Sequence, residues 1–100
     1  EMVVVNAIVS TSADDISALK SAISVMEKAS REEDGCLDYT FSVEVSDPHT
    51  LRITEKWETV DALQAHMATP HMAEFQGAIG AHPPKGMDVK FYSAEEIQPF

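Results

Sequence analysis

The strongest constraint on the fold is a change of hydrophobic period inside residues 51–75, the stretch that holds the only tryptophan. Up to Glu58 the residues alternate between two faces, one of which carries Leu51, Ile53, Glu55 and Trp57. A period of two is typical of a half-buried strand. From Thr59 the spacing becomes helical, with a stripe formed by Val60, Leu63 and Met67. The stretch therefore predicts a strand, a tight turn and a helix, and Pro70 then begins a second short helical piece.

One acid on this strand stands among apolar residues. Glu55 shares a face with Trp57, and burying a carboxylate without a partner is costly. We therefore expect Glu55 to have a partner or to face a polar cavity. His66, at the edge of the helical stripe, is a candidate partner.

The rest of the chain predicts one more helix and three more strands. Two overlapping capping signals, Thr11 with Asp14 and Ser12 with Asp15, open the helix, and Gly35 suits the left-handed turn after it. Thr59 is the candidate cap of the helix that follows the tryptophan strand. The glycines and prolines of Gly77–Gly86 predict a loop, and Ser46–His49 predicts a hairpin turn. The predicted elements are a strand Met2–Ser10, a helix from about Ala13 to Glu32, a strand Cys36–Ser46, a strand Leu51–Glu58 and a last strand Met87–Ser93.

The predicted order is β-α-β-β-α-β, the arrangement of a ferredoxin-like α+β domain. One hundred residues make one such domain, spanning residues 1–100. Helices cover one face of the antiparallel sheet in this arrangement. We expect the other face to be apolar and to be covered by a second copy of the chain, which makes the protein a homodimer.

Charge and cysteine content exclude several partners. The net charge of −10 disfavours nucleic acid and anionic membrane surfaces, because both repel an acidic protein. No apolar run is long enough to span a bilayer. Cys36 is the only cysteine, so no internal disulfide forms, and the chain passes from Glu1-Met2 directly into a strand. We therefore expect no signal peptide and a cytoplasmic location.

Two stretches resemble a known family. Residues 30–39 are similar to its S-R-x-E-x-G-C-x-x-Y pattern, and residues 55–72 are similar to its E-x-W-E-[ST]…L-x-x-H…T-P-H pattern. The chain resembles the antibiotic biosynthesis monooxygenase family of dimeric α+β barrels, and in particular small bacterial quinol monooxygenases. The resemblance implies oxidation of a phenolic or hydroquinone-type aromatic to a quinone with O2 and without a cofactor. Because family members differ in reaction, two alternatives stay open: an isomerase or other non-oxygen enzyme acting on a small polar metabolite, and a non-catalytic ligand-binding dimer.

The resemblance also implies a site. Asn6 and Trp57 match positions near the substrate in quinone-forming members, and His66 matches a helix histidine. In this scheme His66 takes a proton, Asn6 donates to the substrate oxygen or a peroxide, and Trp57 stacks on the ring. We expect five further residues to bind the substrate, namely Tyr39, Phe41, Glu55, Met67 and Phe75. Ile53 replaces a second asparagine that some members use.

Metal and cofactor sites are not expected. His66 and His71 are five residues apart, which does not place them on one helical face, and no cysteine partner is available. In haem-degrading members of the family a helix histidine binds the iron, and by the same resemblance that position holds Gln76 here, so haem is not expected. No glycine-rich phosphate loop is present, so a tightly held flavin or nicotinamide cofactor is not expected either.

Overall fold

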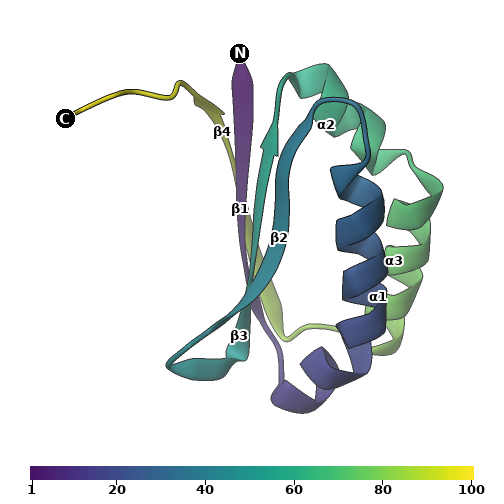
Figure 1. The fold of residues 1–100 in the computed structure, drawn as a ribbon. Helices are drawn as coiled ribbons and strands as arrows, with labels where there is room; N and C mark the ends of the chain where they lie inside the picture. The colour runs from purple at the N-terminus through teal and green to yellow at the C-terminus, as the bar shows by residue number, and fades with distance from the viewer.

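The computed structural model describes all 100 residues as four strands and three helices (Figure 1). The strands form one antiparallel sheet in the order β2-β3-β1-β4, and the helices lie on one face of it. This arrangement confirms the predicted ferredoxin-like α+β fold. The elements are β1 (Met2–Ser10), α1 (Ala13–Arg31), β2 (Cys36–Glu44), β3 (Asp47–Trp57), α2 (Val60–Met67), α3 (Pro70–Ala81) and β4 (Gly86–Ala94).

The core lies between the helices and the central strands. Its most buried members are Val3, Val5, Met26, Tyr39 and Trp57. Trp57 is completely buried, which follows from its place on the helix-facing side of β3 next to the central strand β1. Burial of such large side chains supplies most of the driving force for folding.

The predicted helix starts are confirmed. Ser12 caps α1, its hydroxyl accepting a hydrogen bond from the Asp15 backbone N–H at 3.1 Å. Thr59 caps α2 in the same way, accepting from the Ala62 N–H at 3.1 Å. Gly35 adopts φ 81° after α1, as expected for the turn that ends this helix.

The loop predicted over Gly77–Gly86 is wrong in its first half, because α3 continues to Ala81. A glycine inside a helix costs roughly 1 kcal/mol relative to alanine, which is too little to break a helix that packs well. The Thr69 cap, Pro70 in the first turn and the packed stripe of Met72, Phe75 and Ile79 outweigh that cost.

The hairpin also differs from the prediction. The turn falls at Val45–Ser46, so β3 begins at Asp47 rather than at Leu51. A bulge between Cys36 and Asp38 interrupts the alternation at the start of β2. As a result Leu37 is 52% exposed instead of facing the core with Tyr39, and Cys36 packs against the core in its place.

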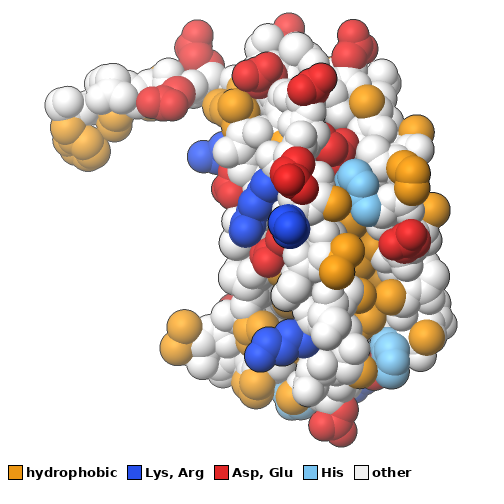
Figure 2. Space-filling model, turned by 45° about the vertical axis from the view of Figure 1, so that its right-hand side comes forward, with side chains coloured by type: hydrophobic (Ala, Val, Ile, Leu, Met, Phe, Trp, Pro, Cys, Tyr) orange, Lys and Arg blue, Asp and Glu red, His pale blue; other side chains and the backbone are white.

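The face of the sheet away from the helices is mixed rather than apolar. It presents Ile8 and Tyr92 among polar side chains, including Asn6, Thr40, Ser42, Arg52, Thr54, Lys56, Asp88 and Lys90. The sequence prediction of an apolar second face is therefore wrong. Residues 95–100 leave the body of the protein on this open side and carry exposed Ile97 and Phe100 (Figures 1 and 2).

Of the three helices, none combines the length and the apolar character needed to cross a membrane.

Candidate functional site

A cavity of about 360 Å³ lies between the sheet and helices α2 and α3. Fifteen of its 17 lining residues are hydrophobic, which places it among sites suited to apolar ligands. Met87, Val89 and Phe91 of β4 line it and are exposed although they lie on the helix-facing side, so the cavity opens toward this edge. The wall is formed by Val5, Ala7, Val9, Tyr39, Phe41, Leu51, Ile53, Glu55, Leu63, Met67, Met72, Phe75, Gln76, Ile79, Met87, Val89 and Phe91.

Glu55 is the one ionisable carboxylate on the cavity wall. It is 9% exposed, and its Oε1 accepts a hydrogen bond from the Trp57 indole N–H at 2.9 Å. Burial raises the pKa of the Glu55 carboxyl above its usual value, although the Trp57 hydrogen bond and His66 act in the opposite direction. The sequence prediction that Glu55 needs a partner is confirmed, with Trp57 as that partner.

Aromatic side chains form one end of the cavity. The rings of Tyr39 and Phe41 lie 5.8 Å apart, and those of Phe41 and Phe75 lie 5.5 Å apart in an edge-on arrangement. Burial, followed by the negative charge of Glu55, raises the pKa of the Tyr39 phenol, which therefore stays protonated. All five residues assigned to substrate binding from the sequence lie on this wall: Tyr39, Phe41, Glu55, Met67 and Phe75.

Trp57 and His66 lie behind the wall rather than on it. Both side chains are completely buried, and their ring centroids are 4.8 Å apart. The His66 ring also lies 5.2 Å from that of Tyr39. These two residues can therefore influence a ligand in the cavity through Glu55 and Tyr39.

The expected pairing of His66 with Glu55 is wrong. The His66 Nδ1–H donates instead to Glu33 Oε2 at 2.7 Å, and its buried Nε2 has no hydrogen-bond partner. The His71 Nε2–H donates to the same Glu33 oxygen at 2.7 Å. The spacing of five residues did not separate the histidines, because α2 ends at Met67 and α3 starts a new helix at Pro70.

Glu33 was missed from the sequence as a site residue. It lies in the connection between α1 and β2, where the sequence indicated only a helix end. One signal was available, since Glu33 is the acid of the matched S-R-x-E-x-G-C pattern.

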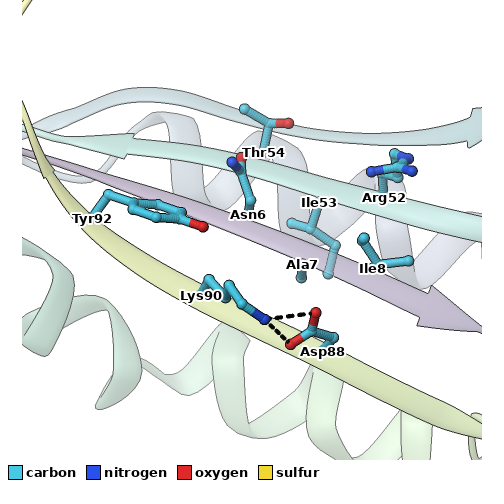
Figure 3. Close-up of a pocket in the computed structure, with 9 residues that line it drawn as sticks. All are labelled: Asn6, Ala7, Ile8, Arg52, Ile53, Thr54, Asp88, Lys90 and Tyr92. Atoms are coloured by element: carbon cyan, nitrogen blue, oxygen red, sulfur yellow. Dashed lines mark hydrogen bonds and ion pairs between the residues drawn. The ribbon is translucent and has the colours of Figure 1, made fainter.

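Asn6 does not join this group. Its side chain is exposed on the open face of the sheet, in a separate hollow of about 290 Å³ (Figure 3). Neighbours in that hollow include Arg52, Thr54 and Tyr92, and Lys90 forms an ion pair with Asp88 at 2.7 Å. The sheet therefore separates Asn6 from Glu55 and Trp57, so the structure does not bring Asn6 together with the other residues assigned to the site.

Fold and site together define a small ferredoxin-like α+β protein with a ligand-sized apolar cavity against its sheet. The model of the antibiotic biosynthesis monooxygenase family matches residues 2–78. The chain belongs to this family, as its sequence patterns predicted.

Solved structures agree with this assignment. A Deinococcus radiodurans protein whose description places it in the same family is 28% identical, with a TM-score of 0.87 and coverage of 98% of this chain and 97% of that one. A Mycobacterium tuberculosis protein, 24% identical, has the same fold with a TM-score of 0.84 over 97% of this chain and 98% of that one. A comparison with curated proteins finds no match.

Proposed function

We propose that this protein is a cofactor-independent monooxygenase that oxidises a phenolic aromatic to a quinone with O2. The observation that carries the proposal is the apolar cavity, whose wall holds one hydrogen-bonded carboxylate, Glu55, and four aromatic rings, those of Tyr39, Phe41, Phe75 and Phe91. Family membership supports oxygen chemistry, and the volume of about 360 Å³ suits a ligand of two or three fused rings.

Glu55 is the proposed proton acceptor. Its carboxylate can accept a proton and lies on the cavity wall, whereas His66 is buried behind the wall. The raised pKa of the carboxyl makes Glu55 a stronger base than an ordinary glutamate. Trp57 positions the carboxylate through its indole N–H, and Glu33 holds the ring of His66 beside that indole.

The proposed reaction needs no electrons beyond those of the substrate. For an anthrone-type phenol, Glu55 removes a proton from the ring CH2, and the resulting anion transfers one electron to O2. The substrate radical and superoxide then combine into a peroxide anion, which takes the proton back from Glu55. Loss of water leaves a carbonyl in place of the CH2, so one oxygen atom enters the product and the other leaves as water. The apolar wall favours charge that is spread over the rings of the anion.

Oxygen uptake by chelator-treated protein tests the proposal. With an anthrone and ¹⁸O2, we expect uptake above that of boiled protein and one labelled oxygen atom per quinone. Glu55→Gln keeps an acceptor for the Trp57 N–H but removes the base, so the rate should fall about 100-fold or more. The matched control is Glu74→Gln on the exposed side of α3. Equal rates in wild type and Glu55→Gln would refute the role of Glu55. Ligand binding without turnover would instead favour a binding protein.

The assembly and location expected from the sequence remain proposals. We propose that the open face of the sheet pairs with a second copy of the chain, supported by exposed Ile8 and Tyr92 and by the projecting tail with Ile97 and Phe100. Light scattering after size exclusion should give the mass of a dimer, about twice 11.0 kDa. We also propose a cytoplasmic location, supported by the single unpaired Cys36.

A further inference from the structure

Three side chains with metal-ligand chemistry meet at one point of the fold. Glu33 comes from the connection between α1 and β2, His66 from α2 and His71 from the first turn of α3. Their potential ligand atoms, one carboxylate oxygen and two imidazole nitrogens, all lie within 4.8 Å of one another. None of the three lines the cavity, so this cluster is distinct from the proposed substrate site.

The surrounding backbone holds these three residues in place. The Thr69 hydroxyl donates to the His66 carbonyl at 2.8 Å and accepts from the Met72 N–H at 3.2 Å, which fixes the junction of α2 and α3. On the other side, the Glu58 N–H donates to the Gly35 carbonyl at 2.8 Å and ties the Glu33 connection to the end of β3. The backbone around the cluster is therefore fixed, and a ligand would have to adjust only the three side chains.

The charge balance at this point favours a cation. Glu33 forms ion pairs only with the two histidines, and no charged nitrogen of a lysine or arginine lies within 4.0 Å of a carboxylate oxygen of Glu33 or Glu55. The negative charge of Glu33 contributes to raising the pKa values of Cys36, Tyr39 and Glu55. A positive charge placed among the three side chains would stabilise both carboxylates.

We propose that Glu33, His66 and His71 form a binding site for a divalent transition-metal ion of the zinc class. The ligand atoms are Glu33 Oε2, His66 Nδ1 and His71 Nε2. Two nitrogens and one oxygen suit Zn²⁺ or Co²⁺, whereas Mg²⁺ and Ca²⁺ prefer oxygen alone. His71 and Glu33 are partly exposed, so water can supply the fourth ligand.

In the present geometry the three side chains are hydrogen-bonded to one another. Each nitrogen lies 2.7 Å from Glu33 Oε2, a hydrogen-bond distance. Zinc bonds of 2.0–2.2 Å in a tetrahedron place neighbouring ligand atoms about 3.3 Å apart. Metal binding therefore requires each of these nitrogens to give up its N–H, the proton moving to the other ring nitrogen or to solvent, and to move away from the oxygen by about 0.6 Å.

Titration of chelator-treated protein with Co²⁺ and then Zn²⁺ tests this site. We expect saturable binding of one ion per chain and the visible absorption typical of four-coordinate Co²⁺. This absorption should disappear when Zn²⁺ displaces Co²⁺. Glu33→Gln and His71→Gln should each weaken binding at least about 100-fold, because loss of even an outer-shell partner costs 10–100-fold. Zn²⁺ should also raise the melting temperature of wild type but not of these variants.

Two matched variants control for nonspecific effects. Glu32→Gln changes the exposed neighbour of Glu33, and His82→Gln changes a histidine that pairs with a single acid, Asp15. Both should bind Co²⁺ like wild type, and circular dichroism confirms that each variant is folded. The proposal is overturned if wild type shows no saturable binding, if Glu33→Gln binds as tightly as wild type, or if His82→Gln abolishes binding.

The metal site and the proposed oxidation can fail separately. Metal binding is measured without substrate, and oxygen uptake is measured on chelator-treated protein. None of the three proposed ligand residues lines the cavity, so the two measurements concern separate places in the fold.

Discussion

The hydrogen bonds of Glu33 lead to a quantitative prediction for Glu33→Ala in chelator-containing buffer. The substitution removes the acceptor of both histidines. His66 is completely buried, so its Nδ1–H loses its partner without gaining water, at a cost of about 1–3 kcal/mol. His71 is partly exposed and can rehydrate, so its lost bond costs about 0.5–1.5 kcal/mol. Relief of the repulsion between Glu33 and Glu55 acts in the opposite direction.

The free energy of unfolding should therefore fall by about 2–4 kcal/mol, which lowers the melting temperature of a 100-residue domain by roughly 10–30 °C. Urea unfolding, followed by circular dichroism at one fixed protein concentration, measures the change. Glu32→Ala is the control and should stay within about 0.5 kcal/mol of wild type, since Glu32 is exposed. A loss below about 1 kcal/mol in Glu33→Ala would refute the reasoning that His66 depends on this single acceptor.

Three further predictions concern single residues. Gly35→Ala should lower the free energy of unfolding by about 2–3 kcal/mol, because φ is 81° and an added Cβ would lie 2.7 Å from that of Ala62. Gly77 has open space around it in α3, so Gly77→Ala should raise the free energy of unfolding by up to about 1 kcal/mol. Urea titrations compare the two variants, and equal effects would contradict the strain argument. The Glu55 carboxyl has a raised pKa in the folded protein, so it binds its proton more tightly there than in the unfolded chain, where its pKa is about 4.3. The favourable contribution of this carboxyl to the free energy of unfolding should therefore be full below about pH 4.3 and be lost as the pH rises through the folded pKa. Urea unfolding at pH 4 and pH 7 should find that Glu55→Gln gains stability relative to wild type at the higher pH. A difference in free energy of unfolding between the two proteins that does not change with pH would contradict this. In Tyr92→Phe the remaining phenol is Tyr39, and an absorbance titration should show tyrosinate forming only together with alkaline unfolding; ionisation within the folded protein would contradict the effect of burial on its pKa.

The fold could be predicted from the sequence because its signals are local and agree with one another. The change of period at Thr59 and the caps at Ser12 and Thr59 appear in the structure where they were expected. The errors arose where local signals compete with packing. Gly77 and Gly80 favour a loop, but the packed side of α3 keeps that segment helical. At the start of β2, a bulge that the residue types do not predict leaves Leu37 exposed.

The site was harder to predict, because its geometry depends on contacts between distant parts of the chain. Glu33 and His66 are 33 residues apart and meet only because α2 packs next to the connection after α1. Asn6 was placed with Trp57 through a resemblance, yet the register pairs Asn6 with Thr54 and sets it on the opposite face. Periodicity gives the face of a residue within its own strand, but it does not say which face of the sheet the helices cover.

Because of the pairing of the strands, whether a residue number is odd or even indicates which face of the sheet its side chain lies on. Val3 pairs with Trp57, Val5 with both Glu55 and Phe91, and Tyr39 with Glu55, so odd-numbered residues lie opposite odd-numbered ones across the sheet. Apart from the irregularities between Cys36 and Asp38 and between Val43 and Glu44, odd positions of the strands therefore face the helix-covered side, which holds the cavity, and even positions face the open side. If the cavity binds substrate and the open face pairs with a second copy, as proposed, substitutions at odd positions should change which ligand binds, and those at even positions should change association. Insertion of a single residue within a strand would reverse this parity beyond that point and exchange the two surfaces.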